Sequence, residues 1–153
     1  MSTSIPRTTP VQETSCTCAM LRRTARRVTQ AYDAALRPAG LRLTQYSILA
    51  NLDRAPGLTI TALAERLVMD RTTLTRNLRP LERAGWVARG PGADARARTL
   101  ALTAAGRATV ERARPFWQAA ERSFRAGLGP ERAGALRDLL DEAARAAERP
   151  ASR

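Results

Sequence analysis

The sequence contains no histidine and no lysine, and it has only two cysteines in 153 residues. Without histidine, the chain lacks the commonest general base and the commonest zinc ligand, so a Ser/His/Asp triad and a His-Glu-x-x-His zinc motif are impossible. A glycine-rich phosphate-binding loop is also missing. We therefore expect a protein that is not an enzyme and that carries no cofactor and no metal.

Further absences exclude secreted and membrane proteins. Two cysteines do not make a disulfide scaffold. Residues 1–15 are rich in threonine, serine and proline and lack the apolar run of a signal peptide. No stretch approaches the roughly 20 apolar residues that cross a bilayer. These features predict a cytoplasmic protein with reduced thiols and no membrane partner.

The charge is strongly one-sided. The chain has 26 basic residues against 14 acidic ones, a formal charge of +12 at pH 7. Such an excess favours a polyanionic partner, and nucleic acid is the obvious candidate. Every basic residue is arginine, whose planar guanidinium suits bidentate contacts to phosphate and to guanine. A GC-rich genome would also favour arginine codons, so the composition by itself decides little.

Apolar periodicity predicts a mainly α-helical domain with a small β-hairpin. Residues 1–15 are expected to form a disordered tail, and residues 16–153 a single domain. Apolar residues three and four apart predict helices, and alternation near residue 100 predicts a strand. The expected order is α-α-α-α-β-β-α-α, with strands at 86–89 and 95–102. The expected helix caps are Thr44, Thr61, Asp70 and Thr103 at the starts and Gly85 at the end of the fourth helix.

The third and fourth helices have the arrangement of a helix-turn-helix. A short helix, a turn at Val68 and Met69, a longer helix and a hairpin together describe a winged helix-turn-helix, whose second helix enters the major groove of DNA. Three leucines of the longer helix are expected in the core, which leaves arginines and threonines outside and no acid before Glu82. An ordinary solvated helix face is the alternative. The predicted DNA contacts on this helix are Arg71, Thr72, Thr73, Thr75, Arg76 and Arg79.

The hairpin supplies a second set of predicted contacts. Arg96 and Arg98 lie where a wing would reach the minor groove, whose negative potential attracts arginine. Asp94 is better placed to hold the Arg96 guanidinium than to contact DNA, so we assign it a supporting role. The alternative is that the two arginines keep an exposed sheet edge soluble.

The same segment carries a family resemblance. The run from Asp94 to Thr103 (DARARTLALT), with Gly106 after it, resembles the wing signature of the MarR family of regulators. The segments LTITALAERLVMDRTTLTRNLRPLERAGWV and GLRLTQYSILANL are similar to that family's helix-turn-helix and to its preceding helix.

The resemblance covers about residues 17–148. It implies a DNA-binding lobe at about 44–103 and dimerisation helices at about 17–37 and 104–148. It also implies a homodimer that binds double-stranded DNA at a pseudo-palindromic operator, usually as a repressor. A non-specific architectural DNA binder is the rival class.

The first helix suggests what the protein senses. Cys18 lies near the helix N-terminus, where the helix dipole and Arg22 favour a thiolate. The segment from Cys18 to Tyr46 is similar to the organic-hydroperoxide sensors of the family, although Arg22 and Leu43 replace aromatic residues of that pattern. The similarity implies that Cys18 is oxidised and that Tyr32 hydrogen-bonds to it. Because about 21 Å of helix rise separates the two residues, Tyr32 must come from the partner subunit.

Two other effectors remain open. Cys18 can instead be a small core hydrophobe, in which case an aromatic or anionic ligand would bind between the dimer helices and the DNA-binding lobe. The third alternative is a soft metal or arsenite held by Cys16 and Cys18. On a helix these two side chains point roughly 200° apart, so chelation requires an unwound segment or a partner thiol.

Overall fold

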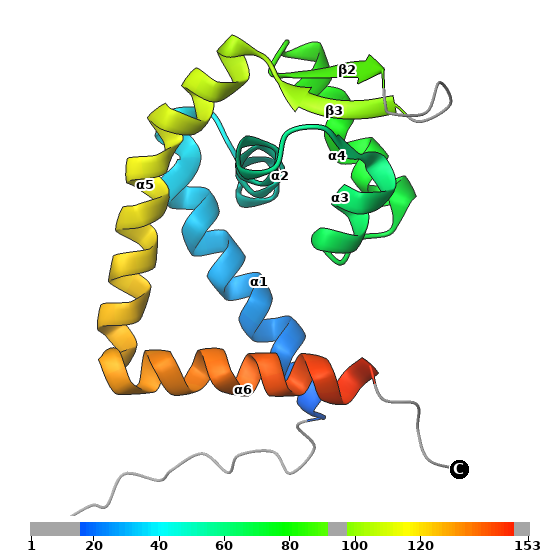
Figure 1. The fold of residues 1–153 in the computed structure, drawn as a ribbon. Coiled ribbons are helices and arrows are strands. Elements are labelled where there is room, and N and C mark those ends of the chain that lie inside the picture. The colour runs from blue at the N-terminus through cyan, green and yellow to red at the C-terminus, as the bar shows by residue number, and fades with distance from the viewer. Residues whose placement is uncertain (1–15, 92–97, 149–153) are drawn as a thin grey trace, which may run out of the picture.

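The computed structural model describes residues 16–91 and 98–148 (Figure 1). Within these ranges the chain forms six α-helices, one short 3-10 helix and a three-stranded antiparallel sheet. The predicted fold class is confirmed. The predicted tail at residues 1–15 and the wing residues Asp94 and Arg96 lie outside the described residues, so their predicted roles stay predictions.

Three long helices form one part of the molecule. These are α1 (Thr17–Leu36), α5 (Ala104–Leu128) and α6 (Pro130–Glu148), which outline an open triangle in the view of Figure 1. The last turns of α1 are buried through Tyr32 and Leu36, whereas α6 buries only Ala133. Most of the apolar residues of α6 therefore remain at least partly exposed in the described part of this chain.

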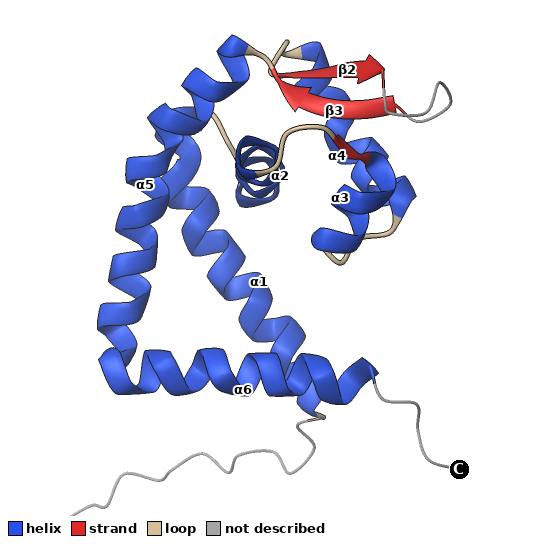
Figure 2. Ribbon diagram, viewed as in Figure 1, coloured by secondary structure: helices blue, strands red, loops and turns tan. Residues whose placement is uncertain are grey.

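The remaining elements form a compact lobe beside α1. Its helices are α2 (Leu43–Arg54), α3 (Ile60–Arg66) and α4 (Arg71–Arg83), and its strands are β1 (Leu58–Thr59), β2 (Val87–Pro91) and β3 (Arg98–Leu102). Figure 2 shows the strands, in red, beside the three helices. Leucines from the helices and from the sheet form one hydrophobic core. The fully buried ones include Leu49, Leu63, Leu74, Leu78, Leu81 and Leu100.

The sheet differs from the prediction in two ways. The strand order is β1-β3-β2, and the two-residue strand β1 was not expected. The segment Gly90-Pro91, predicted as loop, extends β2, where Pro91 pairs with Arg98. Proline is tolerated there because β2 is an edge strand and its outer side needs no N–H donor.

Three predicted helix ends are confirmed. Asp70 Oδ1 accepts the Thr73 N–H at 2.8 Å, and Thr103 Oγ1 accepts the Gly106 N–H at 3.0 Å. Gly85 has φ 71°, and the N–H of Trp86 reaches back to the Leu81 carbonyl at 3.0 Å. This is the left-handed ending that favours glycine after a helix.

Two predicted caps are wrong. The N-cap of α3 is Thr59 and not Thr61, since Thr59 Oγ1 accepts the Ala62 N–H at 3.1 Å. Helix α2 begins at Leu43, so Thr44 lies inside it. The reason is a contact from another helix, because Asp33 of α1 accepts the Leu43 N–H at 2.7 Å. Such a partner is invisible in the local sequence.

Candidate nucleic-acid interface

Helix α4 is held rigidly in the lobe by its apolar side. Leu74, Leu78 and Leu81 are fully buried, as predicted. Asp70 and Gly85 fix its two ends. One side of the helix is thus anchored in the core, and the opposite side is presented to solvent.

The exposed side of α4, called here its outer face, brings most of the predicted DNA contacts together. It forms an open hollow lined by Arg71, Thr72, Thr75, Arg76 and Arg79. Glu82 is the only acidic residue between Arg71 and Arg83. The face therefore carries a concentrated positive charge with neutral hydroxyl groups between the guanidinium groups.

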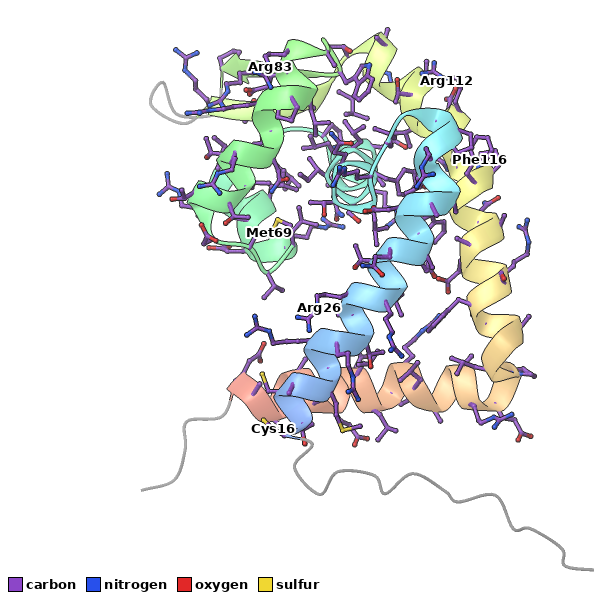
Figure 3. All side chains as sticks on the ribbon, turned by 180° about the vertical axis from the view of Figure 1, so that it is seen from behind. Cys16, Arg26, Met69, Arg83, Arg112 and Phe116 are labelled. Atoms are coloured by element: carbon purple, nitrogen blue, oxygen red, sulfur yellow. The ribbon has the colours of Figure 1, made fainter. Side chains whose placement is uncertain are left out.

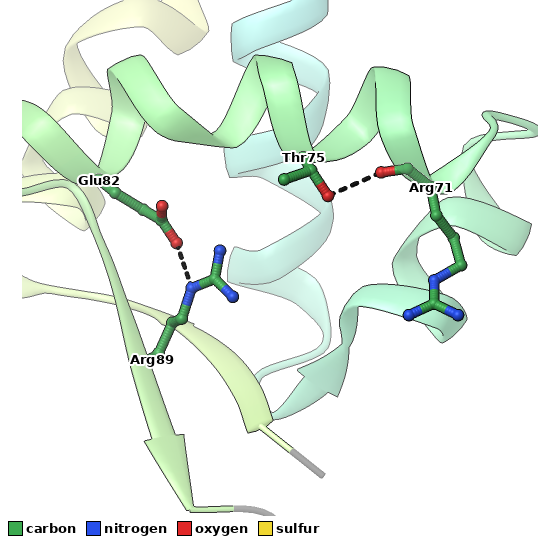
Figure 4. A network of polar contacts seen from close by, with 4 residues as sticks. All are labelled: Arg71, Thr75, Glu82 and Arg89. Atoms are coloured by element: carbon green, nitrogen blue, oxygen red, sulfur yellow. Dashed lines mark hydrogen bonds and ion pairs between the residues drawn. The ribbon is translucent and has the colours of Figure 1, made fainter.

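The threonines of α4 differ in what they offer. The Thr75 hydroxyl donates to the Arg71 carbonyl at 2.7 Å, so its proton is already used (Figure 4). Thr75 therefore presents a methyl group and an acceptor oxygen, which suit a thymine methyl better than a phosphate. Thr73 does not line the hollow, and its N–H serves the Asp70 cap. The backbone of Thr73 thus helps to start α4, and a DNA contact by its side chain stays a prediction.

The wing is described only at its base. Arg98 is exposed at the start of β3, opposite Pro91 of β2. The Thr99 hydroxyl donates to the Pro91 carbonyl at 3.2 Å across the same hairpin. Arg98 therefore lies beside the segment that carries Asp94 and Arg96, where the sequence placed it.

An ion pair between α4 and the wing was missed by the sequence reasoning. Arg89 Nε of β2 donates to Glu82 Oε1 of α4 at 2.6 Å (Figure 4). The signal that identifies it is strand parity, since Val87 and Arg89 share one side of β2 and Val87 is buried. Arg89 must then extend toward the helix that covers that side.

The residues predicted to sense oxidation lie at different places along α1. Cys16 is the N-cap residue and Cys18 lies in the first turn, and both are exposed, as is Arg22. Figure 3 shows Cys16 at the end of α1 farthest from the sheet. Tyr32 is buried near the other end. Within the described part of this chain Cys18 is therefore not a core residue.

The Tyr32 hydroxyl already has a partner. It donates to Glu121 Oε2 of α5 at 2.6 Å, and its ring packs edge-on against Phe124. Burial, followed by the hydrogen bond and the charge of Glu121, raises the pKa of Tyr32 well above its ordinary value. Tyr32 is thus a neutral phenol whose oxygen can still accept a hydrogen bond.

A second hollow lies between the end of α1 and the start of α2. Two arginines and several polar groups line it, namely Gln30, Asp33, Arg37, Gly40, Leu41, Arg42 and Gln45. Arg37 and Arg42 outnumber the one carboxylate of Asp33, which accepts the Leu43 N–H, so the opening favours an anionic guest.

Other kinds of site find no support in the described ranges. Residues 16–91 and 98–148 hold no cluster of three potential metal ligands among Cys, Asp and Glu. No helix in those ranges combines the length and the apolar character needed to cross a membrane.

Comparison with known proteins agrees with this geometry. The model of the MarR family matches residues 39–97. The HTH-type transcriptional repressor Rv2887 of Mycobacterium tuberculosis is 35% identical over 111 residues, which are 71% of this chain and 79% of that protein.

Solved structures show the same similarity. The M. tuberculosis transcriptional regulator MosR, solved in complex with DNA, is 42% identical with a TM-score of 0.75, covering 88% of this chain and 100% of that chain. The repressor CouR of Rhodococcus jostii RHA1, bound to a 23-mer DNA duplex, is 30% identical with a TM-score of 0.78. The match covers 84% of this chain and 92% of that chain. With the winged lobe, its arginine-lined helix and these relatives in agreement, the chain belongs to the MarR family.

Proposed function

We propose that this protein is a sequence-specific transcriptional repressor that binds double-stranded operator DNA through α4. The outer face of α4 carries the proposal, because its exposed groups are arginines and threonines. Arginine reads guanine in the major groove and threonine contacts thymine methyl groups. The wing, through Arg98 and the predicted Arg96, contacts the adjacent minor groove. The relatives MosR and CouR, both solved with DNA, support this role.

The repressor acts as a homodimer. Leu139 and Leu140 of α6 are 61% and 45% exposed, and Met20 and Leu21 of α1 are 45% and 42% exposed. Large apolar side chains exposed on neighbouring long helices mark an interaction surface. A two-fold dimer built through these helices presents two α4 helices, which matches a pseudo-palindromic operator.

Footprinting on selected DNA tests the DNA-binding proposal. We expect protection of two half-sites about one helical turn apart. Arg76→Ala is expected to relax base preference at one position per half-site, because Arg76 reads a base edge. Arg145→Ala, on a polar side of α6, serves as the control that removes one charge elsewhere. Binding without sequence preference would instead indicate an architectural DNA binder.

We further propose that organic hydroperoxide releases the operator by oxidising Cys18. The thiolate sulfur attacks one peroxide oxygen, an S–O bond forms as the O–O bond breaks, and the organic part leaves as an alcohol after taking up a proton. Sulfur is oxidised to sulfenic acid and the peroxide is reduced. Cys18 is exposed in the single chain, which leaves it free to lie opposite Tyr32 of the partner subunit in the dimer. The hydroxyl oxygen of Tyr32 of the partner subunit then accepts a hydrogen bond from the sulfenic acid. It acts as the acceptor because the Tyr32 O–H already donates its hydrogen bond to Glu121.

A mobility-shift assay with micromolar organic hydroperoxide tests the sensing step. Wild type is expected to leave the operator, and Cys18→Ser is expected to stay bound. Cys16→Ser is the matched control, and mass spectrometry then shows whether the product is a sulfenic acid or a disulfide with Cys16. An equal peroxide response of wild type and Cys18→Ser would dispose of the redox mechanism while leaving the DNA-binding proposal intact.

A small-molecule effector is the second candidate. The hollow between α1 and α2 presents Arg37 and Arg42, which can hold a carboxylate or another anion. The similar repressor CouR has been solved bound to p-coumaroyl-CoA. Salicylate-like aromatic acids, and arsenite as a probe of the two thiols, belong in the same assay. Release by an aromatic acid that Arg37→Ala abolishes would favour this candidate.

A further inference from the structure

The ion pair between Glu82 and Arg89 lies where the outer face of α4 meets the wing. Both side chains are partly open to solvent, at 25% and 32% of their surface. Arg89 uses its Nε for the contact with Glu82. Figure 4 shows its two terminal Nη groups pointing along α4 in the direction of Thr75 and Arg71.

Helix geometry places Glu82 on the outer face. At about 100° per residue, Arg71, Thr75 and Glu82 lie within about 40° of one another around the helix axis. The buried Leu74, Leu78 and Leu81 lie about 20–80° to one side of Arg71, so this row forms the margin of the outer face next to the core. Glu82 therefore brings the Arg89 guanidinium to the end of the same face that carries the predicted base-reading residues.

The charges at this position have a consequence for DNA binding. An unpaired carboxylate on this face would repel the phosphate backbone. The 2.6 Å pair neutralises Glu82, and it uses only one of the five N–H donors of the guanidinium. An arginine oriented by a carboxylate in this way is suited to donate from its Nη groups to a phosphate oxygen.

We propose that Arg89 is a DNA-phosphate contact and that Glu82 is the positioning residue that aims it. This inference rests on the proposed function and adds to it a contact at the junction of helix and wing. The competing explanation is that the pair only fastens the wing to α4. Fastening would affect stability, whereas a phosphate contact affects how binding depends on salt.

Fluorescence anisotropy with the selected operator, measured over a series of salt concentrations, separates the two explanations. Each phosphate contact contributes about 0.9 to the slope of log affinity against log salt. Arg89→Gln is therefore expected to lower the slope by about 1.8 per dimer. Arg89→Lys keeps the charge and is expected to keep the slope at several-fold lower affinity. Arg112→Gln on α5 is the control for net charge and is expected to keep the slope of wild type.

Glu82→Gln tests the positioning role. The charge of Arg89 remains but its orientation is lost, so we expect an unchanged slope and an affinity that is several-fold lower. Tighter binding by Glu82→Gln would overturn the positioning role, because it would show that the carboxylate only repels DNA.

Thermal unfolding of each variant shows whether a change in binding follows a change in stability. Wild-type slope and affinity in Arg89→Gln, whatever its melting temperature, would overturn the phosphate contact alone. Wild-type protein without any operator preference would overturn the proposed function, and this inference with it.

Discussion

At the scale of single residues, Gly106 shows how closely two elements approach. The N–H of Thr103, at the start of α5, donates to the Trp86 carbonyl at 3.0 Å. The Thr103 hydroxyl donates to the Gly85 carbonyl at 2.6 Å. A Cβ at position 106 would overlap the Trp86 carbonyl oxygen. Glycine at this position is therefore required by packing, and it joins α5 to the end of α4.

Gly106→Ala is expected to lower the free energy of unfolding by about 1–3 kcal/mol, the usual cost of overpacking. Urea unfolding followed by circular dichroism measures the change. Gly127→Ala on the same helix is the matched control, since its Cβ would meet nothing within 4 Å. The control is expected to be neutral or more stable by up to about 1 kcal/mol, as alanine favours the helix. Equal effects in both variants would contradict the packing argument.

The sequence predicted which residues of α4 face outward, but not what their polar groups contact. Buried leucines at helical spacing were enough to place Arg71, Arg76 and Arg79 on the outer face. The partner of Tyr32 was not predictable, because Glu121 lies 89 residues away along the chain. Local patterns fix the direction of a side chain, whereas hydrogen-bond partners depend on how distant elements pack.

At the scale of elements, the helices followed from periodicity and the sheet did so only in part. The long helices carry several turns of apolar repeat, and each was predicted close to its observed range. Strand β1 has two residues, Leu58 and Thr59, which is too short for an alternating pattern. It exists because it pairs with Leu100 and Thr99 of β3. Such long-range pairing leaves no local signal.

The start of α4 depends on the ionisation of Asp70. Hydrogen bonds from Thr73, through its side chain and its backbone N–H, lower the pKa of Asp70 below its usual range. A lowered folded-state pKa means that the ionised carboxylate stabilises the folded state. This contribution is present above the unfolded pKa of about 3.9 and is lost as the pH falls through the folded pKa.

Asp70→Asn is the variant that isolates this effect, because asparagine caps a helix without titrating in this range. We expect wild type to lose more stability than Asp70→Asn when the pH falls from about 5 to about 3. Urea unfolding at each pH measures the difference between the two proteins, so that other carboxylates cancel. Parallel pH profiles would show that the cap does not depend on the charge of Asp70.

At the scale of the whole molecule, the charged surface proposed to bind DNA and the apolar surface proposed to form the dimer lie on different helices. The outer face of α4 and the wing gather arginine on one part of the chain. The exposed leucines lie on α6, which buries only Ala133 in this chain. Periodicity predicted that α6 is amphipathic, but it did not distinguish an apolar side that packs within the chain from one that packs on a second copy. The exposed fractions show that this side does not pack within the described part of the chain, and the second copy stays a proposal.

Leu139→Glu tests the assignment of this surface. A carboxylate at a 61% exposed position costs little within the single chain, so the variant is expected to fold. In a dimer the same carboxylate would lose its hydration, and we expect light scattering to show a monomer. Operator affinity is expected to fall by at least about tenfold, because one α4 then binds one half-site without the contribution of the second. Arg145→Glu, on a polar side of α6, is the control that adds a carboxylate and keeps the dimer. A dimeric Leu139→Glu with wild-type affinity would place the dimer surface elsewhere.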